Sequence, residues 1–388
     1  MALEGLDTIA WSELETAQGD PAELPAHLRA LRSADPEERK QARWSLYGMV
    51  FQQGTRFKAA IQVIPFLYEL VLDPDTPERG PLLQLILHLG LGYEDAHLPV
   101  GISSHELQAA LAELEQSMSP AEAAQCQELG VGPVVDWGCY ETAAFQALEL
   151  IPLLADPDPL VRQMSAYLLA WFPGEGCTIC PALEARLDEE SEPRHLANLL
   201  LALGLQAQQS HHEVDAALLR ERLDHESLAV RVAAAISLAP TDLSERVMEV
   251  LLEGSGEVES LAAEGLTWNG GDLAGLAGLV LAIHGRPARE RVAPALAAAL
   301  EGADPARGLD LTQALLHLIR PEDEAGFVGK RGADLDDTAR AALAAIADHG
   351  PWTLSDPAGG EALFAEYAQM FADYGLPASP EELRGLLA

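Results

Sequence analysis

Basic residues are scarce in this chain of 388 residues, and their scarcity excludes two classes of partner. Only three lysines are present. The chain has 24 Lys and Arg residues in total and 61 Asp and Glu residues, which gives a formal net charge of −37. Binding to a nucleic-acid backbone requires Lys and Arg side chains that displace condensed counterions, and anionic membrane surfaces attract basic segments. We therefore expect no nucleic-acid partner and no membrane partner. A negative charge of this size attracts a protein with a basic surface, although keeping the chain soluble would also explain it.

Cysteine and long apolar runs are scarce as well. The four cysteines do not make a disulfide framework in a chain of this length. No apolar run approaches the roughly 20 residues that cross a bilayer. The first residues, MALEGLDTIAWSELE, are acidic and have no basic segment followed by an apolar one, so we expect no secretory signal there. The sequence thus predicts a cytoplasmic location.

Strand patterns are missing too, and a helical repeat takes their place. β-branched residues are sparse, and no alternating apolar run is bounded by hairpin turns. Instead, an acidic turn, a basic residue and an amphipathic helix recur in this order. The clearest copies are LDPDTPERGPLLQLILHLGL (72–91), ADPDPLVRQMSAYLLAWF (155–172), LDEESEPRHLANLLLALGL (187–205) and LDHESLAVRVAAAISLA (223–239).

The chemistry of helix ends explains one copy of the repeat. Asp or Ser accepts hydrogen bonds from free N–H groups at a helix start, Pro suits the first turn, and acidic groups there favour the helix dipole. The Arg that comes next can bond an Asp or a carbonyl of the neighbouring turn. A second short helix completes each unit, and since so small a pair cannot bury its apolar side alone, the pairs must stack. The sequence predicts an all-α fold, a right-handed α-α superhelix of stacked helical hairpins.

The expected order of parts is one continuous solenoid with an insertion. Its parts are 1–91 (N-terminal repeats), 92–139 (a helical insertion), 140–350 (further repeats) and 351–388 (helices that cap the open end). Within the insertion, Ser103 with Glu106 and Ser119 with Glu122 have the spacing of capping boxes, which predicts two helices. Long insertions in repeat folds lie on one face and often carry binding residues.

The first half of the chain is the candidate binding region. Fourteen of the 21 aromatic residues lie between Trp11 and Phe172, and aromatic side chains are enriched at interface hot spots. Gly54 is expected to end a helix, and the polar residues beside it cluster donors and acceptors, although satisfying helix-end carbonyls would also explain them. The binding residues that we expect are Phe51, Gln52, Gln53, Gly54, Thr55, Arg56, Tyr93, Glu94, Trp137, Tyr140 and Glu141.

Motifs that carry chemistry are few. Cys177 and Cys180 form a lone C-x-x-C, which lacks the further ligands of a zinc site and the βαβ context of a redox motif. We interpret both as buried packing residues, with Cys180 at the start of a helix. The adjacent His211 and His212 do not share a helix face, which indicates a solvated turn. No serine-hydrolase, P-loop or zinc-protease motif occurs. The sequence therefore predicts no catalytic residue, no metal site and no cofactor.

The repeats give the chain a family resemblance. Their period, caps and placing of Asp and Arg are similar to HEAT repeats over about 25–350. The N-terminal half also resembles a narrower group, the HEAT-repeat proteins of actinomycetes and related bacteria. The matching stretches are LPAHLRALRSADPEERKQARWSLYGMVFQQGTRFKAA, LLQLILHLGLGYEDAHLP and CYETAAFQALELIPLLADPDPLVRQMSAYLLAWFP. Such proteins usually show an F/W-H-Q-G-T-like turn, where this chain has Gln52 in place of the His. The resemblance implies a protein-interaction scaffold.

Two functions stay open on these residues. The first is a non-enzymatic scaffold with an acidic curved surface that binds a basic protein, and an immunity-like or antitoxin-like role is one version of it. Such binding should weaken as ionic strength rises. The alternative is a HEAT-like enzyme of the lyase type or a small-molecule binder, with a pocket under the 92–139 insertion beside Trp137 and Cys139. That alternative predicts perturbed ionisable groups around a pocket.

Overall fold

The computed structural model describes residues 3–321, 326–352, 354–355, 361–362 and 365–388. These residues form 20 α-helices joined by turns and short 3-10 helices. The strands among them are two antiparallel pairs, β1 (Phe51–Gln52) with β2 (Thr55–Arg56) and β3 (Leu354–Ser355) with β4 (Glu361–Ala362). The predicted all-α class is therefore confirmed.

The chain divides into two compact units, Met1–Val214 and Asp215–Ala388. The helices of the first unit are α1 (Leu24–Ala30), α2 (Pro36–Val50), α3 (Ala59–Leu72), α4 (Arg79–Leu91), α5 (Ser104–Ser117), α6 (Pro120–Leu129), α7 (Pro133–Gln146), α8 (Pro159–Leu169), α9 (Gly176–Leu187) and α10 (Pro193–Ser210). The unit also contains the 3-10 helices η4 (Glu94–His97) and η5 (Ala147–Ala155).

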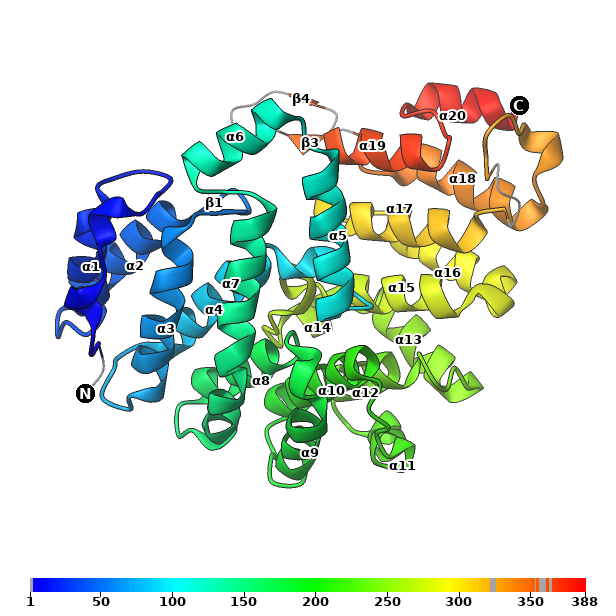
Figure 1. Cartoon of the computed structure of the whole chain (residues 1–388). Helices are drawn as coiled ribbons and strands as arrows, with labels where there is room; N and C mark the ends of the chain where they lie inside the picture. The colour runs from blue at the N-terminus through cyan, green and yellow to red at the C-terminus, as the bar shows by residue number, and fades with distance from the viewer. Residues whose placement is uncertain (1–2, 322–325, 353, 356–360, 363–364) are drawn as a thin grey trace. The chain divides into compact units, whose positions relative to one another are not determined.

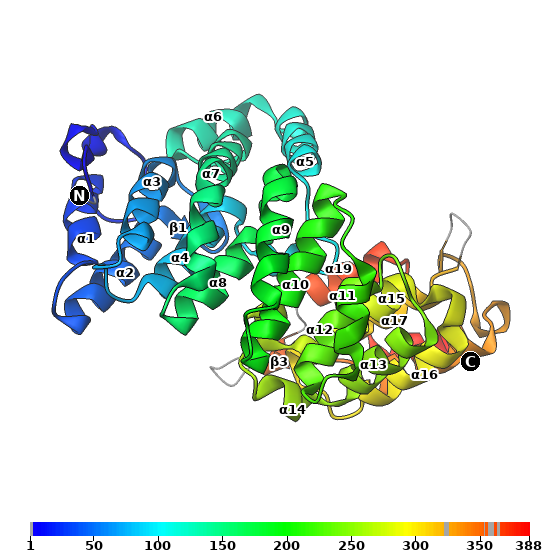
Figure 2. The ribbon, with the colours of Figure 1, turned by 90° about the horizontal axis from the view of Figure 1, so that it is seen from below.

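Helices of the first unit pack in sequence order. α1 packs against α2, α3 against α4, α4 against α7 and α8, and α8 against α10, which also packs against α9. Figure 2 shows α2, α3, α4, α7 and α8 following one another across this unit. The core between them is apolar and includes Trp171 and Phe172, which are at most 2% exposed. α5 and α6 fall in the predicted insertion, and both capping boxes that predicted them are present.

Arginines near the helix starts bind the turns that precede them. Arg39, Arg162 and Arg231 each donate to the carbonyl six residues earlier, at 2.9, 2.9 and 3.0 Å. Asp35 and Asp158 cap the helices that carry the first two of these arginines, each accepting a backbone N–H two residues on. The prediction that the repeat Arg binds a carbonyl of the turn is confirmed.

Arginines near the helix starts of the first unit also link one helical pair to the next. Arg39, Arg79 and Arg162 each form an ion pair with an acidic residue of the turn before a later helix, because stacking brings that turn next to the guanidinium. The pairs are Arg39 with Glu78 at 2.8 Å, Arg79 with Asp156 at 2.8 Å and Arg162 with Glu190 at 3.5 Å. The acidic turn and the Arg of the repeat therefore form a ladder of ion pairs along the first unit.

The second unit consists of further helical pairs. Its helices are α11 (Ala216–Arg220), α12 (Leu228–Leu238), α13 (Glu245–Gly256), α14 (Val258–Ala262), α15 (Leu273–His284), α16 (Arg289–Leu300), α17 (Pro305–Ile319), α18 (Asp337–His349), α19 (Ala365–Asp373) and α20 (Pro380–Leu387). α15 is buried from Leu273 to Ala282, and it packs against α13 and α17. These helices appear from green to red in Figure 1.

Helices also form at the C-terminal end, where capping helices are expected. α18 packs against α20, and α20 starts with Ser379 accepting the backbone N–H of Glu382. Phe371 of α19 is buried and its ring lies 5.0 Å from the ring of Trp352. The prediction for 351–388 also falls on residues 353, 356–360 and 363–364, which lie outside the described residues.

Three local predictions are wrong. Gly54 does not end a helix, because α2 already ends at Val50 and Gly54 lies in the turn between β1 and β2, a hairpin that the sequence did not predict. Cys180 is buried as expected, but Cys177 is exposed. The second helix of that pair starts at Gly176 and not near Cys180, so Cys177 occupies its first turn.

Candidate functional site

A tight hairpin follows α2 in the region predicted to bind. β1 and β2 enclose Gln53 (φ 50°) and Gly54 (φ 86°). Two positive φ values in a two-residue loop are typical of a type I′ turn, which favours glycine. A Cβ atom added at Gly54 would lie 3.1 Å from the Tyr93 ring. The glycine therefore serves both the turn and the close approach of Tyr93.

The hairpin is fixed by an aromatic cluster around Phe51. The Phe51 side chain is 1% exposed. The centroid of its ring lies 5.0 Å from the ring centroid of Tyr47, 5.7 Å from that of His88 and 5.6 Å from that of Tyr93. Tyr93 is 54% exposed, so its outer side is open to solvent. Phe51 thus supports the fold, while Tyr93 is accessible to a partner.

Arg56 fastens the other strand of the hairpin to two helices. Its Nε donates to Asp136 Oδ1 of α7 at 2.7 Å, and its Nη1 donates to the Gly90 carbonyl of α4 at 3.4 Å. The Arg56 side chain is buried, and a buried charge needs such partners to offset its lost hydration. Arg56 is therefore a structural link between the hairpin and the helices.

Glu94 is a buried acid at the centre of the predicted site. Its Oε1 accepts from the Tyr167 hydroxyl at 3.0 Å, and its Oε2 lies 3.6 Å from His88 Nε2. Burial raises the pKa of the Glu94 carboxyl, and burial lowers the pKa of the His88 imidazole, because both charged forms lose hydration. On its other side, His88 Nδ1 lies 3.5 Å from the Tyr47 hydroxyl. The four side chains form one polar chain through the core.

Replacing Glu94 by Gln is expected to change how stability depends on pH. Because its pKa is higher in the folded chain than in the unfolded chain, stability falls as the pH rises from the ordinary carboxyl pKa of 4.5 through the raised folded pKa. Glutamine cannot ionise, so Glu94→Gln should become more stable relative to the wild type across this window, and the two curves should meet at the acidic end. Urea unfolding at a series of pH values measures the free-energy difference.

Glu141→Gln is the matched control for this experiment, because Glu141 is exposed on α7. Glu141→Gln should differ from the wild type by less than about 0.5 kcal/mol, as substitutions of exposed side chains do. A difference between Glu94→Gln and the wild type that stays constant at every pH would contradict a raised carboxyl pKa.

The remaining predicted residues lie on α7. The Trp137 ring is stacked 5.5 Å from Tyr140, and Tyr140 lies 5.6 Å from Phe172 of the core. Tyr140 is 3% exposed, whereas Glu141 faces solvent. The structure thus brings the hairpin, Tyr93 and Glu94 together, and places Trp137 and Tyr140 in a second aromatic stack that is continuous with the core.

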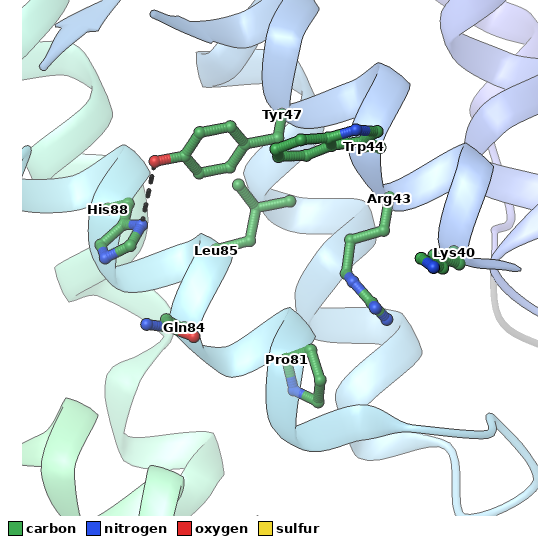
Figure 3. Close-up of a pocket in the computed structure, with 8 residues that line it drawn as sticks. All are labelled: Lys40, Arg43, Trp44, Tyr47, Pro81, Gln84, Leu85 and His88. Atoms are coloured by element: carbon green, nitrogen blue, oxygen red, sulfur yellow. Dashed lines mark hydrogen bonds between the residues drawn. The ribbon is translucent and has the colours of Figure 1, made fainter. Parts of the chain in front are cut away.

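A pocket opens at the His88 end of the polar chain (Figure 3). It lies between α2 and α4 and has a volume of about 400 Å³. Its lining residues are Lys40, Arg43, Trp44 and Tyr47 of α2, with Pro81, Gln84, Leu85 and His88 of α4. Neither Trp137 nor Cys139 lines it, so it is a different place from the pocket expected under the insertion.

The pKa values of two potential nucleophiles in this region, Tyr47 and Cys139, are raised. Burial, together with the nearby Tyr93 and Glu94, raises the pKa of the Tyr47 hydroxyl to about 12. Burial also raises the pKa of the Cys139 thiol to about 12. A nucleophile is activated by a lowered pKa or an adjacent base, so these shifts act in the wrong direction. In the part of the chain that is described, no three His, Cys, Asp or Glu side chains are grouped to hold a metal ion.

An exposed acidic segment is the feature that the sequence reasoning missed. From residue 80 to residue 161 the chain contains 12 Asp and Glu residues and neither Lys nor Arg. α5 and α6 lie in the middle of this stretch, and we call them the acidic arm (residues 104–129). α5 buries only Leu107 and α6 buries no residue. A count of charges in a sliding window would have revealed the stretch from the sequence.

Comparison with known proteins adds no assignment. No protein-family model matches the chain, and no curated protein matches it. Among the helices that the structure describes, none combines the length and the apolar character needed to span a membrane. Function is therefore inferred from the geometry and charge of the described residues.

Proposed function

We propose that this chain is a non-enzymatic scaffold of the HEAT-repeat type that binds a protein partner with a basic surface. The proposal includes the stacking of its helical pairs into a right-handed superhelix, which the packing of α4 against α8 and of α8 against α10 supports. We assign the partner contact to the acidic arm. A role of immunity or antitoxin type is one form that this function can take.

The observation that carries the proposal is that α6 contributes no fully buried residue to the core of the first unit. It has ten residues and none is buried, although isolated helices of this length are marginal in water. Its ends are well capped, by the capping box of Ser119 with Glu122 and by Gly130 in the left-handed conformation. Because no residue of α6 is fully buried, and all but Cys126 are exposed, its side chains are free to pack against a partner.

The side chains of the arm indicate what kind of partner it suits. Glu113, Glu115 and Glu128 are exposed, and they form no ion pair with the residues described here. Leu114 and Leu129 are 51% and 49% exposed. Acidic groups around exposed leucines fit a partner that presents Lys and Arg around an apolar contact.

Two arginines of the first unit do not neutralise this surface, because they are paired inside the fold. Arg79 and Asp156 are each 8% exposed in their ion pair, and Arg56 is held by Asp136. Basic groups that are paired internally add little to the field outside. The outward field is therefore set by the unpaired acids, which favours a basic partner.

Some of the residues predicted to bind a partner are buried, and others are exposed to solvent. Phe51, Arg56, Glu94 and Tyr140 are buried, so a partner cannot contact them directly. The accessible ones are Gln52, Gln53, Thr55, Tyr93 and Glu141. We propose these as a secondary contact beside the arm.

The test is capture of partners from a lysate of the source organism, followed by binding measurements with the purified partner. Basic proteins should be retained at about 50 mM salt and released at about 500 mM, where screening shortens the range of charge interactions to a few ångströms. The triple variant Glu113→Gln, Glu115→Gln, Glu128→Gln should bind about tenfold more weakly at low salt, if each exposed charge contributes about 0.5 kcal/mol.

A variant with the same change in net charge is the control. Glu226→Gln, Glu259→Gln and Glu290→Gln alter exposed acids of the second unit, and affinity for the partner should be unchanged. Equal weakening by both variants would mean that only overall charge matters, and it would overturn the assignment to the arm. Binding that is insensitive to salt, or nucleic acid recovered with the chain, would overturn the proposal itself.

A further inference from the structure

The pocket between α2 and α4 differs in charge from the rest of the molecule. Two of its eight lining residues, Lys40 and Arg43, are basic, and none is acidic. Both lie on α2, one turn apart, so their charged groups can reach the same anion. In a chain with a net charge of −37, a basic lining is an exception that calls for an explanation.

The acids near this lining do not cancel it. Glu78 accepts from Arg39 at 2.8 Å and from Arg43 at 3.3 Å, so its single charge is shared between two guanidinium groups. The hydrogen bond from Arg39 is the largest of the effects that lower the pKa of Glu78. Glu37 and Glu38 lie earlier on α2 and do not line the pocket. Lys40 is exposed and forms no ion pair within the described part of the chain.

The middle of the pocket is lined by apolar and aromatic side chains. Trp44 is 73% exposed, which is unusual for so large an apolar ring, and Figure 3 shows its indole beside the Tyr47 ring above Leu85. Pro81 continues the apolar floor on α4. A planar ring that slides over Leu85 could stack against the exposed indole and remove it from water.

The opposite end of the pocket offers neutral hydrogen-bonding groups. Gln84, the Tyr47 hydroxyl and His88 line it. Burial lowers the pKa of His88, so its imidazole is neutral at pH 7 and can donate or accept. The lining spans two turns of each helix, roughly 11 Å. One basic end, one aromatic wall and one neutral polar end thus follow one another along the pocket.

We propose that this pocket binds a small planar aromatic molecule that carries a carboxylate or phosphate, with the anion at Lys40 and Arg43 and the ring against Trp44. The volume of about 400 Å³ is in the range of small-molecule sites. The two anions share the chemistry that Lys and Arg recognise. This binding is separate from the partner contact of the acidic arm, and it does not depend on that contact.

The test uses defined probes and calorimetric titration of the full chain. Indole-3-acetate joins a ring to a carboxylate, and adenosine monophosphate joins a ring to a phosphate. Tryptophol and adenosine supply the rings alone, and acetate and inorganic phosphate supply the anions alone. At least one of the two joined probes should bind with a dissociation constant below about 1 mM, and its separate halves should bind at least about tenfold more weakly. The joined probe that binds more tightly identifies the anion.

Variants then locate the site. Lys40→Met with Arg43→Met, and separately Trp44→Ala, should each weaken the joined probe about tenfold or more, in line with the loss of a charged or aromatic anchor. These side chains are on the surface or half-buried, so the fold should survive. Lys58→Met, at another of the three lysines and outside the pocket, should bind the probe as the wild type does.

Three results would overturn the proposal. One is that neither joined probe binds more tightly than its halves. The second is that the probe still binds fully to the Lys40→Met, Arg43→Met variant, and the third is that Lys58→Met weakens it equally. The triple Glu→Gln variant of the acidic arm should keep its affinity for the probe. A failure of the partner proposal therefore leaves this result unaffected, and the reverse also holds.

Discussion

Replacing Arg79 by Met is expected to lower the free energy of unfolding of the first unit by about 3–5 kcal/mol. Arg79 Nη2 donates to Asp156 Oδ1 at 2.8 Å, and each side chain is only 8% exposed. Removal of the guanidinium would leave a buried carboxylate without its partner, and this costs more than an intact exposed ion pair contributes. Because the ion pair joins α4 to the turn before α8, breaking it should weaken the packing between consecutive helical pairs.

Two further variants separate the ion pair from the rest of the contact. Arg79→Met with Asp156→Asn removes both charges, so it should recover a large part of the loss, and the double-mutant cycle gives the coupling. Arg29→Met breaks the pair of Arg29 with Asp7, which is just as short at 2.6 Å but is 49% and 80% exposed. It should cost at most about 1 kcal/mol. If Arg79→Met costs no more than Arg29→Met, the ion-pair ladder contributes nothing to stacking.

Replacing Phe172 by Ala is expected to cost about 3–5 kcal/mol of unfolding free energy, as large-to-small changes in packed cores do. Phe172 is 2% exposed. Its ring lies 5.6 Å from Tyr140 of α7, and a Cβ atom at Gly90 of α4 would come within 2.9 Å of it. The ring thus fills the space where α4 and α7 meet the end of α8, and its removal would leave a cavity there.

The exposed Phe145 is the matched control. Its side chain is 88% exposed on α7, so Phe145→Ala should change stability by less than about 0.5 kcal/mol. Guanidinium unfolding followed by circular dichroism measures both variants. Similar losses for the two would contradict the burial of Phe172, and with it the packing of α8 against α4.

Features that depend on a single helical turn could be predicted from the sequence. The capping boxes of Ser103 with Glu106 and of Ser119 with Glu122 are both present, because three residues of spacing are enough to define them. The same is true of Arg162, which donates to the carbonyl of Asp156 six residues earlier. Local chemistry of this kind does not depend on what packs nearby.

Features that depend on packing between helices could not be predicted in this way. Strands of two residues have no alternation to detect, so the hairpin around Gly54 was missed. Lys40 and His88 line the same pocket only because α2 and α4 lie side by side. Phe51 and Arg56 flank a tight turn, where exposure is the usual expectation, yet both are buried. Tyr47 of α2, His88 of α4 and Tyr93 pack against Phe51, and α4 and α7 bind Arg56.

Hydrogen exchange of the chain with and without its purified partner tests the central claim most directly. α6 buries none of its residues, so its amides should exchange quickly in the free chain. If the acidic arm is the contact, residues 104–129 should become protected when the partner binds, while the exchange of the buried helix α15 stays as it was. Protection that appears elsewhere and leaves residues 104–129 unchanged would contradict the account.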